Sequence, residues 1–187
     1  MKKLILLTIG ALCAHFANAQ SDAEQKAWME YATPGAMQQK LAEANGNWTE
    51  ETTMWMQPGQ PPMKSKGTAK NEMILGGRYQ QSTFTGDFMG MPFQGISITG
   101  YDNARKVWVS SWIDNMGTGI MNSEGVMLPD GKSIEFRGKM TDAMTGKLTE
   151  FREVFSFIDK DHQKMEMYVT QGVTEMKTME LALTRAK

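Results

Sequence analysis

The sequence is poor in the residues that most catalytic and metal sites need. It has one cysteine, Cys13, and two histidines, His15 and His162, in 187 residues. Cys13 and His15 lie within the first 19 residues, which we predict to be removed as a signal. The remaining chain would have no thiol and a single imidazole. This excludes disulfides, cysteine nucleophiles, iron–sulfur clusters and zinc sites built from cysteines or several histidines within one chain.

The first 19 residues have the pattern of a cleavable secretory signal. A basic start, Lys2-Lys3, precedes an apolar run from Leu4 to Ala14 and an A-x-A cleavage site at Ala17–Ala19. We predict cleavage after Ala19 and export, to the periplasm or as a secreted protein. Residues 20–187 are then expected to form a single domain.

Long apolar runs and an excess of one charge are also absent from the mature chain. No stretch after residue 19 approaches the roughly 20 apolar residues of a membrane-spanning helix, so we expect no transmembrane segment and a soluble product. The whole chain has 20 basic and 21 acidic residues, and losing Lys2 and Lys3 leaves a net charge of −3. This balance argues against nucleic acid and anionic membranes as partners. Nothing in the sequence predicts an oligomeric state.

Catalytic motifs are missing as well. The chain has no G-x-S-x-G, no P-loop and no dinucleotide-binding G-x-G-x-x-G after a strand. The acidic neighbours Glu50 and Glu51 point to opposite faces of a strand, so they cannot act on one substrate. We therefore expect a protein that is not an enzyme and has no cofactor.

What the chain does have is many short segments rich in Thr, Val, Ile, Phe, Tyr and Trp, separated by turn residues. One helix is expected before them, over Ala36–Ala44, with Trp28 and Tyr31 packed beneath it. The ten expected strands are Asn47–Met56, Lys66–Leu75, Arg78–Thr85, Phe93–Tyr101, Lys106–Asp114, Thr118–Met127, Lys132–Met140, Leu148–Ile158, Lys164–Thr170 and Glu175–Arg185. Connections this short join antiparallel neighbours, and closure removes the two unpaired edges. The expected fold is all-β: an antiparallel up-and-down barrel of about ten strands with a short N-terminal helix.

The two ends of this strand series predict how the barrel closes. Gly46-Asn47-Trp48 opens the first strand and Arg185 ends the last. First and last strands are neighbours in a closed barrel, so we expect the Arg185 guanidinium over the Trp48 indole, where it plugs the closed end. The arrangement resembles the calycin superfamily of lipocalins and fatty-acid-binding proteins. An unrelated open β-sandwich is the alternative.

A more specific resemblance is carried by runs spread over residues 28–186. These runs are Trp48, Gly76–Tyr79, Gly100–Asn103, Trp112–Ile120, Thr145–Lys147, Glu166–Tyr168 and Lys177–Glu180. They resemble the bacterial domain of unknown function family 1579, and W-I-D-x-M-G-T-G-I is the most specific of them. The resemblance implies a barrel related to lipocalin-like folds. It carries no established activity and therefore implies no functional residues.

Strand alternation suggests residues that contact a ligand in the lumen. Trp108, Trp112 and Asp114 share one face of a strand. Arg78 or Arg152 is expected to pair with Asp114 and orient a polar group of the ligand. The alternative is that Asp114 caps the turn that follows it.

Glu166 and Tyr168 are further candidates for ligand contact. They share one face of a strand, and Met165 and Met167 share the other. A one-residue change of register exchanges the two faces, so alternation leaves open which pair points inward.

Methionine is unusually frequent, with 18 residues, and three M-x-M pairs occur, at 54–56, 89–91 and 165–167. Thioethers suit Cu(I) or Ag(I), and His162 lies three residues before Met165, so a soft-metal site is one alternative. Methionine is also an adaptable filler of apolar pockets. His162 could serve as a single axial haem ligand, as in the related nitrobindin barrels, but its charged turn argues against this.

Together these observations predict a protein that binds a small apolar or amphipathic molecule in its lumen. Soft-metal binding is the first alternative. The second is a non-catalytic envelope protein that meets a protein partner through the apolar loop at 88–93. The apolar segment Gly86–Pro92 could also act as a lid over an open barrel end.

Overall fold

The computed structural model describes residues 21–187 except 58 and 173, so the predicted signal and its cleavage site lie outside the described residues. The chain divides into two compact units, one up to Thr33 with Asn103–Arg105 and one of Pro34–Asp102 with Lys106–Lys187. The first unit contains a helix over residues 21–32. Its Trp28 and Tyr31 rings pack against each other with their centres 5.9 Å apart.

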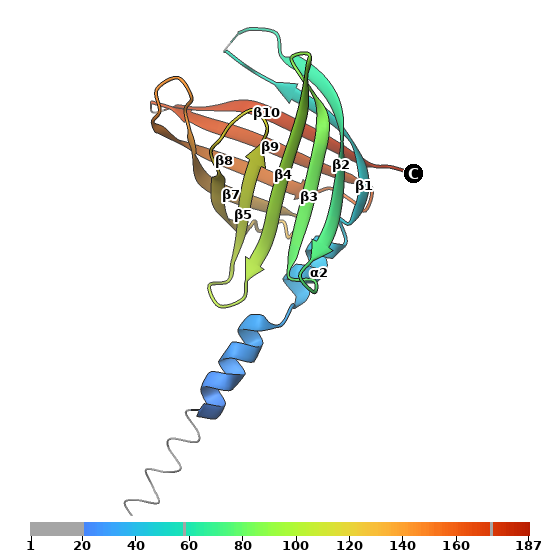
Figure 1. Ribbon diagram of the computed structural model, residues 1–187, viewed down its shortest axis with the longest axis vertical. Coiled ribbons are helices and arrows are strands. Elements are labelled where there is room, and N and C mark those ends of the chain that lie inside the picture. Colours follow the sequence, from blue (N-terminus) through green and yellow to red (C-terminus); the bar gives the residue numbers. More distant parts are fainter. Residues whose placement is uncertain (1–20, 58, 173) are drawn as a thin grey trace, which may run out of the picture. The chain divides into compact units, whose positions relative to one another are not determined.

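The second unit is a closed antiparallel barrel of ten strands, which confirms the predicted fold class (Figure 1). Each strand pairs with its neighbours in the sequence, and β1 pairs with β10. The strands are β1 Gly46–Met54, β2 Met63–Ile74, β3 Tyr79–Phe88, β4 Met91–Asp102, β5 Val107–Asp114, β6 Met121–Met127, β7 Ser133–Thr141, β8 Leu148–Phe157, β9 His162–Gln171 and β10 Thr174–Arg185. A short helix, α2 Ala36–Ala42, precedes them.

The expected lid is instead the tip of a tight hairpin. Phe88 pairs with Met91 across β3 and β4, so the turn consists of Met89 and Gly90 alone. Both residues have positive φ, at 55° and 81°, as a two-residue hairpin turn requires. Asp87 accepts a bond from the Gly90 N–H at 2.7 Å and fixes the turn. A proline near the end of a strand, here Pro92, is compatible with this pairing.

Helix α2 lies at the end of the barrel where β1 begins, which we call the closed end (Figure 1). Carbonyl groups after the last turn of a helix lack partners within the helix, and inward side chains of the barrel supply them here. Gln80 donates to the Leu41 carbonyl at 2.6 Å, and Asn71 and the Trp48 indole donate to the Ala44 carbonyl at 3.1 and 2.9 Å. The helix is thereby tied to three strands.

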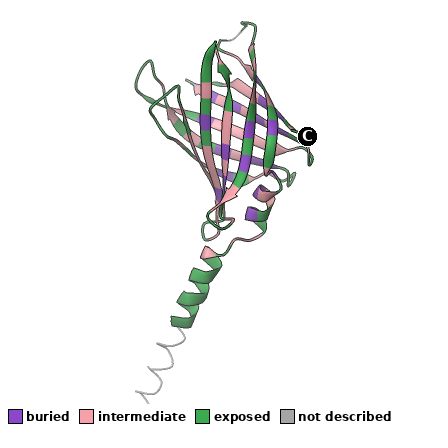
Figure 2. Ribbon diagram, turned by 45° about the vertical axis from the view of Figure 1, so that its right-hand side comes forward, coloured by how far each residue is buried: buried purple, intermediate pink, exposed green. Residues whose placement is uncertain are grey.

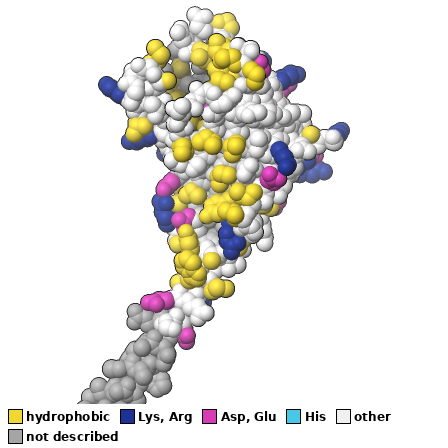
Figure 3. Space-filling view, viewed as in Figure 1, with side chains coloured by type: hydrophobic (Ala, Val, Ile, Leu, Met, Phe, Trp, Pro, Cys, Tyr) yellow, Lys and Arg dark blue, Asp and Glu magenta, His cyan; other side chains and the backbone are white. Residues whose placement is uncertain are grey.

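Alternation along each strand separates the lumen from the outer face. Buried positions alternate with more exposed ones along the strands (Figure 2). In β9 the buried positions are Gln163, Met165, Met167 and Val169. The outer face has its own apolar patches, visible over β3 to β5 in Figure 3, where Ile96 pairs with Ile113 and both are exposed. Within the described part of the chain, none of the helices is both long and apolar enough to cross a membrane.

Candidate ligand cavity in the barrel

The barrel encloses a cavity of about 380 Å³, a volume within the usual range for small-molecule sites. Two dissimilar walls line it. On the side of β3 to β6 five of the inward residues are small and carry hydroxyl groups, and large residues accompany them: the small ones are Ser82, Ser97, Thr99, Ser110 and Ser123, and the large ones include Phe84, Phe93, Trp112 and Met121. On the side of β8 to β10 most inward residues are large and apolar, including Phe151, Phe155, Met165, Met167, Met179 and Leu181, and Glu153 and Gln163 are the polar ones.

The register explains why the lumen is open rather than filled. Thr99, Ser110 and Ser123 are cross-strand partners, so three small side chains form one continuous row across β4, β5 and β6. Strand β4 lies opposite β9 in the ring of ten. Strand number sets the diameter of a barrel and side chains decide how much of it is filled, so short side chains on one wall leave space in front of the other.

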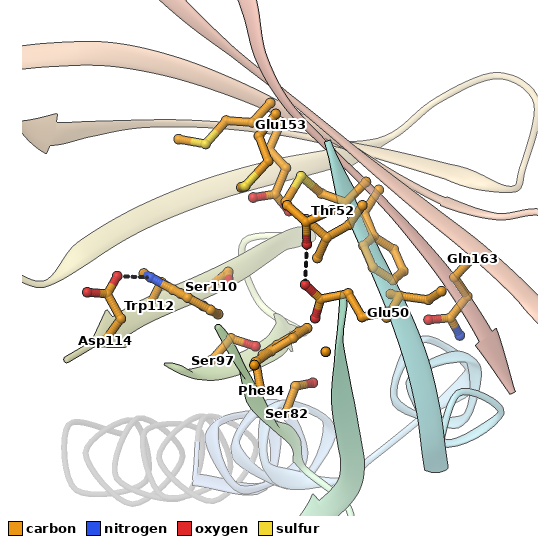
Figure 4. Close-up of a pocket in the computed structure, with 18 of the residues that line it drawn as sticks. Glu50, Thr52, Ser82, Phe84, Ser97, Ser110, Trp112, Asp114, Glu153 and Gln163 are labelled. Carbon is orange, nitrogen blue, oxygen red and sulfur yellow. Dashed lines mark hydrogen bonds between the residues drawn. The ribbon is translucent and has the colours of Figure 1, made fainter. Parts of the chain in front are cut away.

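Trp112 stands at the open end of this cavity among aromatic side chains. Its ring packs on Phe84 at 5.3 Å and Phe93 at 6.3 Å, and the indole N–H donates to Asp114 at 2.7 Å (Figure 4). The other carboxylate oxygen of Asp114 accepts bonds from the N–H groups of Met116 and Gly117. Asp114 therefore caps its turn, as one alternative had it, and also fixes the indole.

Glu153 is the most unusual group of the lumen. It projects into the cavity from β8 (Figure 4). Its cross-strand neighbours, Phe136 and Met167, are both apolar. Within the described part of the chain its carboxyl group has no hydrogen-bond or ion-pair partner. Burial alone raises the pKa of Glu153 to about 7, because a charged carboxylate is poorly solvated in this position.

Glu50 is a second inward carboxyl group, on β1. Burial raises its pKa, and a hydrogen bond from the Thr52 hydroxyl partly opposes this shift (Figure 4). Its sequence neighbour Glu51 points outward and pairs with Lys66 at 3.3 Å. Lys66 is the one basic residue among the described lining residues, and its side chain is 83% exposed. Glu50 and Glu153 thus have no cationic counterpart inside the lumen among the described residues.

Of the ligand-binding residues predicted from the sequence, Trp112 and Asp114 line the cavity, and Trp108 does not. Trp108 is 1% exposed and packs with Tyr101 and Leu41 in the core below the cavity. Arg78 lies in the β2–β3 turn and donates to the Leu75 carbonyl at 3.2 Å, so it does not pair with Asp114.

Glu166, Tyr168 and Arg152 lie on the outer face, because the inward positions of β9 and β8 are taken by Met165, Met167 and Phe151. Glu166 pairs with Lys164 and Lys177. Arg152 stacks over the Tyr168 ring at 4.0 Å and pairs with Glu175. The expected contacts of Glu166 and Tyr168 with a luminal ligand, and of Arg152 with Asp114, therefore have no geometric support.

The closed end has the arrangement that the sequence predicts. Trp48 is the register partner of Arg185, and the guanidinium carbon lies 4.3 Å from the centre of the indole ring. Arg185 also donates to the carbonyls of Glu43, Asn45 and Lys160. One side chain thus joins the residues after α2, the first strand and the β8–β9 turn.

His162 is not brought to the lumen or to the M-x-M pairs. It lies at the start of β9, half-exposed, with Nδ1 bonded to the Asp159 carboxylate at 2.9 Å. Met165 points into the cavity instead. Neither a luminal haem nor a His162–Met165 metal site fits this placement. Within the described residues no group of three or more histidines, cysteines and acids could hold a metal.

Sequence reasoning missed Glu153, Thr52 and the luminal role of Glu50. The inward position of Glu50 could have been predicted from the sequence. Glu50 is two residues from Trp48 on the same strand, so both side chains point to the same face, and the barrel closure places Trp48 inward. For Glu153 the flanking Phe151 and Phe155, two residues away on each side, gave the same kind of signal. The pattern was weak because Arg152 and Val154 make the opposite face equally mixed.

Comparison with known proteins agrees with this architecture. The crystal structure of Rv2717c from M. tuberculosis superposes with a TM-score of 0.62 at 15% identity, covering 83% of this chain and 100% of that one. At this identity the likeness concerns the fold alone. A comparison with curated proteins gives no significant match. The model of a family described as protein of unknown function, DUF1579, matches residues 33–185. The chain therefore belongs to the DUF1579 family.

Proposed function

We propose that this protein is an exported binding protein that holds a small apolar or amphipathic molecule in its barrel lumen and catalyses no reaction. The single observation that carries the proposal is the row of small residues Thr99, Ser110 and Ser123 facing the apolar wall of β8 to β10. Protein interiors are normally packed to the density of organic crystals. A cavity of about 380 Å³ in the centre of a small barrel is therefore a costly feature unless something occupies it.

The lining suits an amphipathic occupant. Aromatic rings and thioethers supply adaptable apolar contact, and the hydroxyl wall supplies a few polar positions. Trp112, Phe84 and Phe93 meet at the open end, where a ligand would pass them on entry.

Native mass spectrometry of the protein isolated from a bacterial periplasm tests this proposal. We expect extra mass corresponding to a retained organic molecule, and quenching of tryptophan fluorescence when an apolar probe such as decanol is added to the emptied protein. A variant that fills the lumen, Ser110→Phe, should abolish binding. Its control is Ser111→Phe, at the neighbouring outward position, which should bind as the wild type does. Equal binding by both variants would contradict the proposal.

Soft-metal binding is a second candidate, favoured by one observation. Met54, Met179 and Met167 are successive cross-strand partners on the inner faces of β1, β10 and β9. Three thioethers in one row suit Cu(I). This candidate expects stoichiometric Cu(I) uptake that is lost in Met167→Leu/Met179→Leu. It also expects that uptake is kept in Met89→Leu/Met91→Leu at the β3–β4 hairpin tip.

A protein with neither ligand nor metal would favour the interaction alternative. The surface to test is then the hairpin tip from Phe88 to Phe93. A pull-down with the protein and with a variant in which Met89 and Met91 are serine would show whether this tip holds a partner.

A further inference from the structure

Two buried amide oxygens beside the lumen have no hydrogen-bond partner within the described part of the chain. Among the described residues, the buried side-chain atoms without a partner are Asn71 Oδ1 and Gln163 Oε1. Asn71 and Gln163 are 6% and 3% exposed, and both line the cavity. The Asn71 amide is oriented by the hydrogen bond that its Nδ2–H donates to the Ala44 carbonyl, and its Oδ1 is left without a donor. Buried polar atoms are normally satisfied, so these oxygens call for a donor from within the cavity.

The donors of the lining are largely engaged by the protein itself. The Gln80 amide is bonded to the Leu41 carbonyl, the Trp112 indole to Asp114, and the Thr52 hydroxyl to Glu50. The hydroxyls of the small-residue wall can donate or accept, so they do not favour one kind of ligand.

The charged side chains of the lining also favour a ligand that donates hydrogen bonds, because acids project into the cavity. Glu153 and Glu50 both project into the cavity (Figure 4). Glu153 lies on β8 and Glu50 on β1, and β9 and β10 lie between these two strands in the ring. Asp87 and Asp114, at the open end, are the other acids of the lining, and each accepts bonds from its own turn. The side chain of Lys66 is engaged outside with Glu51. Within the described lining, no basic side chain faces the lumen to neutralise a carboxylate.

We propose that the occupant of this cavity is an apolar molecule that carries an amine, bound with its ammonium group at Glu153 and its hydrocarbon part against the apolar wall of β8 to β10. This inference rests on the proposed ligand-binding function and specifies the ligand class. An ammonium group bound at Glu153 supplies this carboxylate with N–H donors and a positive charge. The side chains beside Glu153 are those of Phe136 and Met167. Both are apolar and offer the carboxylate neither a hydrogen-bond donor nor a positive charge.

A fatty acid fits the same cavity less well. Its carboxylate would enter a space into which Glu50 and Glu153 already project and which no basic side chain of the described lining faces, and like charges in a poorly solvated site repel strongly. A fatty alcohol would occupy the apolar space with neither favourable nor unfavourable charge interactions. Three ligands with the same hydrocarbon chain but an amine, alcohol or carboxylate head group therefore distinguish a preference for amines from general binding of apolar molecules.

The test compares decylamine, decanol and decanoate by isothermal titration calorimetry at pH 8 with the full mature protein. We expect decylamine to bind about tenfold tighter than decanol, and decanoate to bind weaker than both. Glu153→Gln keeps the shape of the side chain and removes its charge. It should lower the affinity for decylamine about tenfold and change the affinity for decanol less than about twofold. Glu150→Gln, an exposed acid on the same strand, is the matched control and should leave both affinities unchanged.

The outcomes separate this inference from the proposed function. Binding of none of the three probes would overturn both. Binding of decanol and decanoate at least as tight as that of decylamine would overturn the amine inference and leave the apolar-ligand function standing. A preference for decylamine that survives in Glu153→Gln and is lost in Glu50→Gln would overturn the assignment to Glu153. A preference lost equally in Glu150→Gln would show attraction to the surface charge and would also overturn it.

Discussion

Arg185 lies over the indole of Trp48, 4.3 Å from the ring centre, at the register position where the last strand meets the first. The contact joins the two ends of the barrel sequence. The same guanidinium donates to carbonyls of Glu43 and Asn45 after α2, and of Lys160 in the β8–β9 turn. Three segments distant in the sequence thus depend on one side chain.

Removal of this side chain should therefore destabilise the barrel. Arg185→Ala leaves three carbonyl groups without their donor and exposes the face of Trp48, and we expect a loss of about 2–3 kcal/mol in the free energy of unfolding. Urea denaturation followed by tryptophan fluorescence measures it. Arg137→Ala is the matched control, because Arg137 is an exposed arginine that forms a surface ion pair with Glu135, and it should cost less than about 0.5 kcal/mol. Equal losses in the two variants would contradict a special role for Arg185.

The carboxyl group of Glu153 should make stability fall as pH rises. Its pKa is about 7 in the folded protein and ordinarily 4.5, so between these values the folded state binds a proton that the unfolded state has lost. The free energy of unfolding should therefore fall as pH rises from 4.5 to 7. The contribution of Glu153 alone to this fall is ~3 kcal/mol. Denaturation midpoints of the wild type and Glu153→Gln from pH 4.5 to 8 measure the effect.

The difference between the two proteins isolates Glu153 from other acids. The pKa values of Glu166 and Glu180 are lowered by their bonds to Lys177 and Lys164, so their stability is lost at acid pH, with the opposite sign, in both proteins. The other charged group facing the cavity near Glu153 is Glu50, whose pKa is raised. We expect the stability advantage of Glu153→Gln to grow with pH up to about 7 and then level off. An advantage independent of pH would mean that Glu153 titrates normally.

The outer face of β9 should not matter for ligand binding. Glu166 and Tyr168 point away from the lumen, toward Lys177 and Arg152. Glu166→Gln and Tyr168→Phe should change the affinity for decanol by less than about twofold, measured by fluorescence quenching. A large loss of affinity in either variant would place the ligand outside the barrel.

Much of the fold was predictable because strand period and turn chemistry are local signals. Short turns alone lead to an antiparallel meander, and closure then places Trp48 beside Arg185. The hairpin tip was harder, since Gly86, Gly90 and Pro92 together are typical of a loop, yet cross-strand pairing continues to Phe88 and Met91. The pairing energy of two long strands outweighs the local preference of those residues.

The site was less predictable, because lining a lumen is a property of register across strands. Trp112 and Asp114 were found because their strand has two tryptophans on one face. Met165 and Glu166 are adjacent on β9 and therefore point to opposite faces of the strand. The pairing of β9 with β8 and β10 decides which of the two faces the lumen. Glu153 needed the same information, because the signal from Phe151 and Phe155 on its own strand was too weak to decide which face is inward.

Gly95 should control the position of Trp112 and thereby the open end of the cavity. A Cβ atom at position 95 would lie 2.4 Å from the Trp112 ring, closer than such contacts occur, and 3.3 Å from the Phe93 ring. Gly95→Ala must therefore displace the indole, which weakens its bond to Asp114. We expect a shifted tryptophan emission and about a tenfold weaker affinity for decanol, a loss typical of a misplaced aromatic contact.

Gly119→Ala is the control for this prediction, since an added Cβ there would meet Thr141 at an ordinary 3.8 Å. It should leave both the emission and the affinity unchanged. The stability of Gly95→Ala, measured in parallel, distinguishes displacement of the indole from unfolding. A folded Gly95→Ala protein with a shifted emission and normal affinity would show that Trp112 can move without affecting the ligand. In that case the aromatic group at the open end would serve the packing of β3 to β5, and selection of the ligand would depend on the deeper lumen around Glu153.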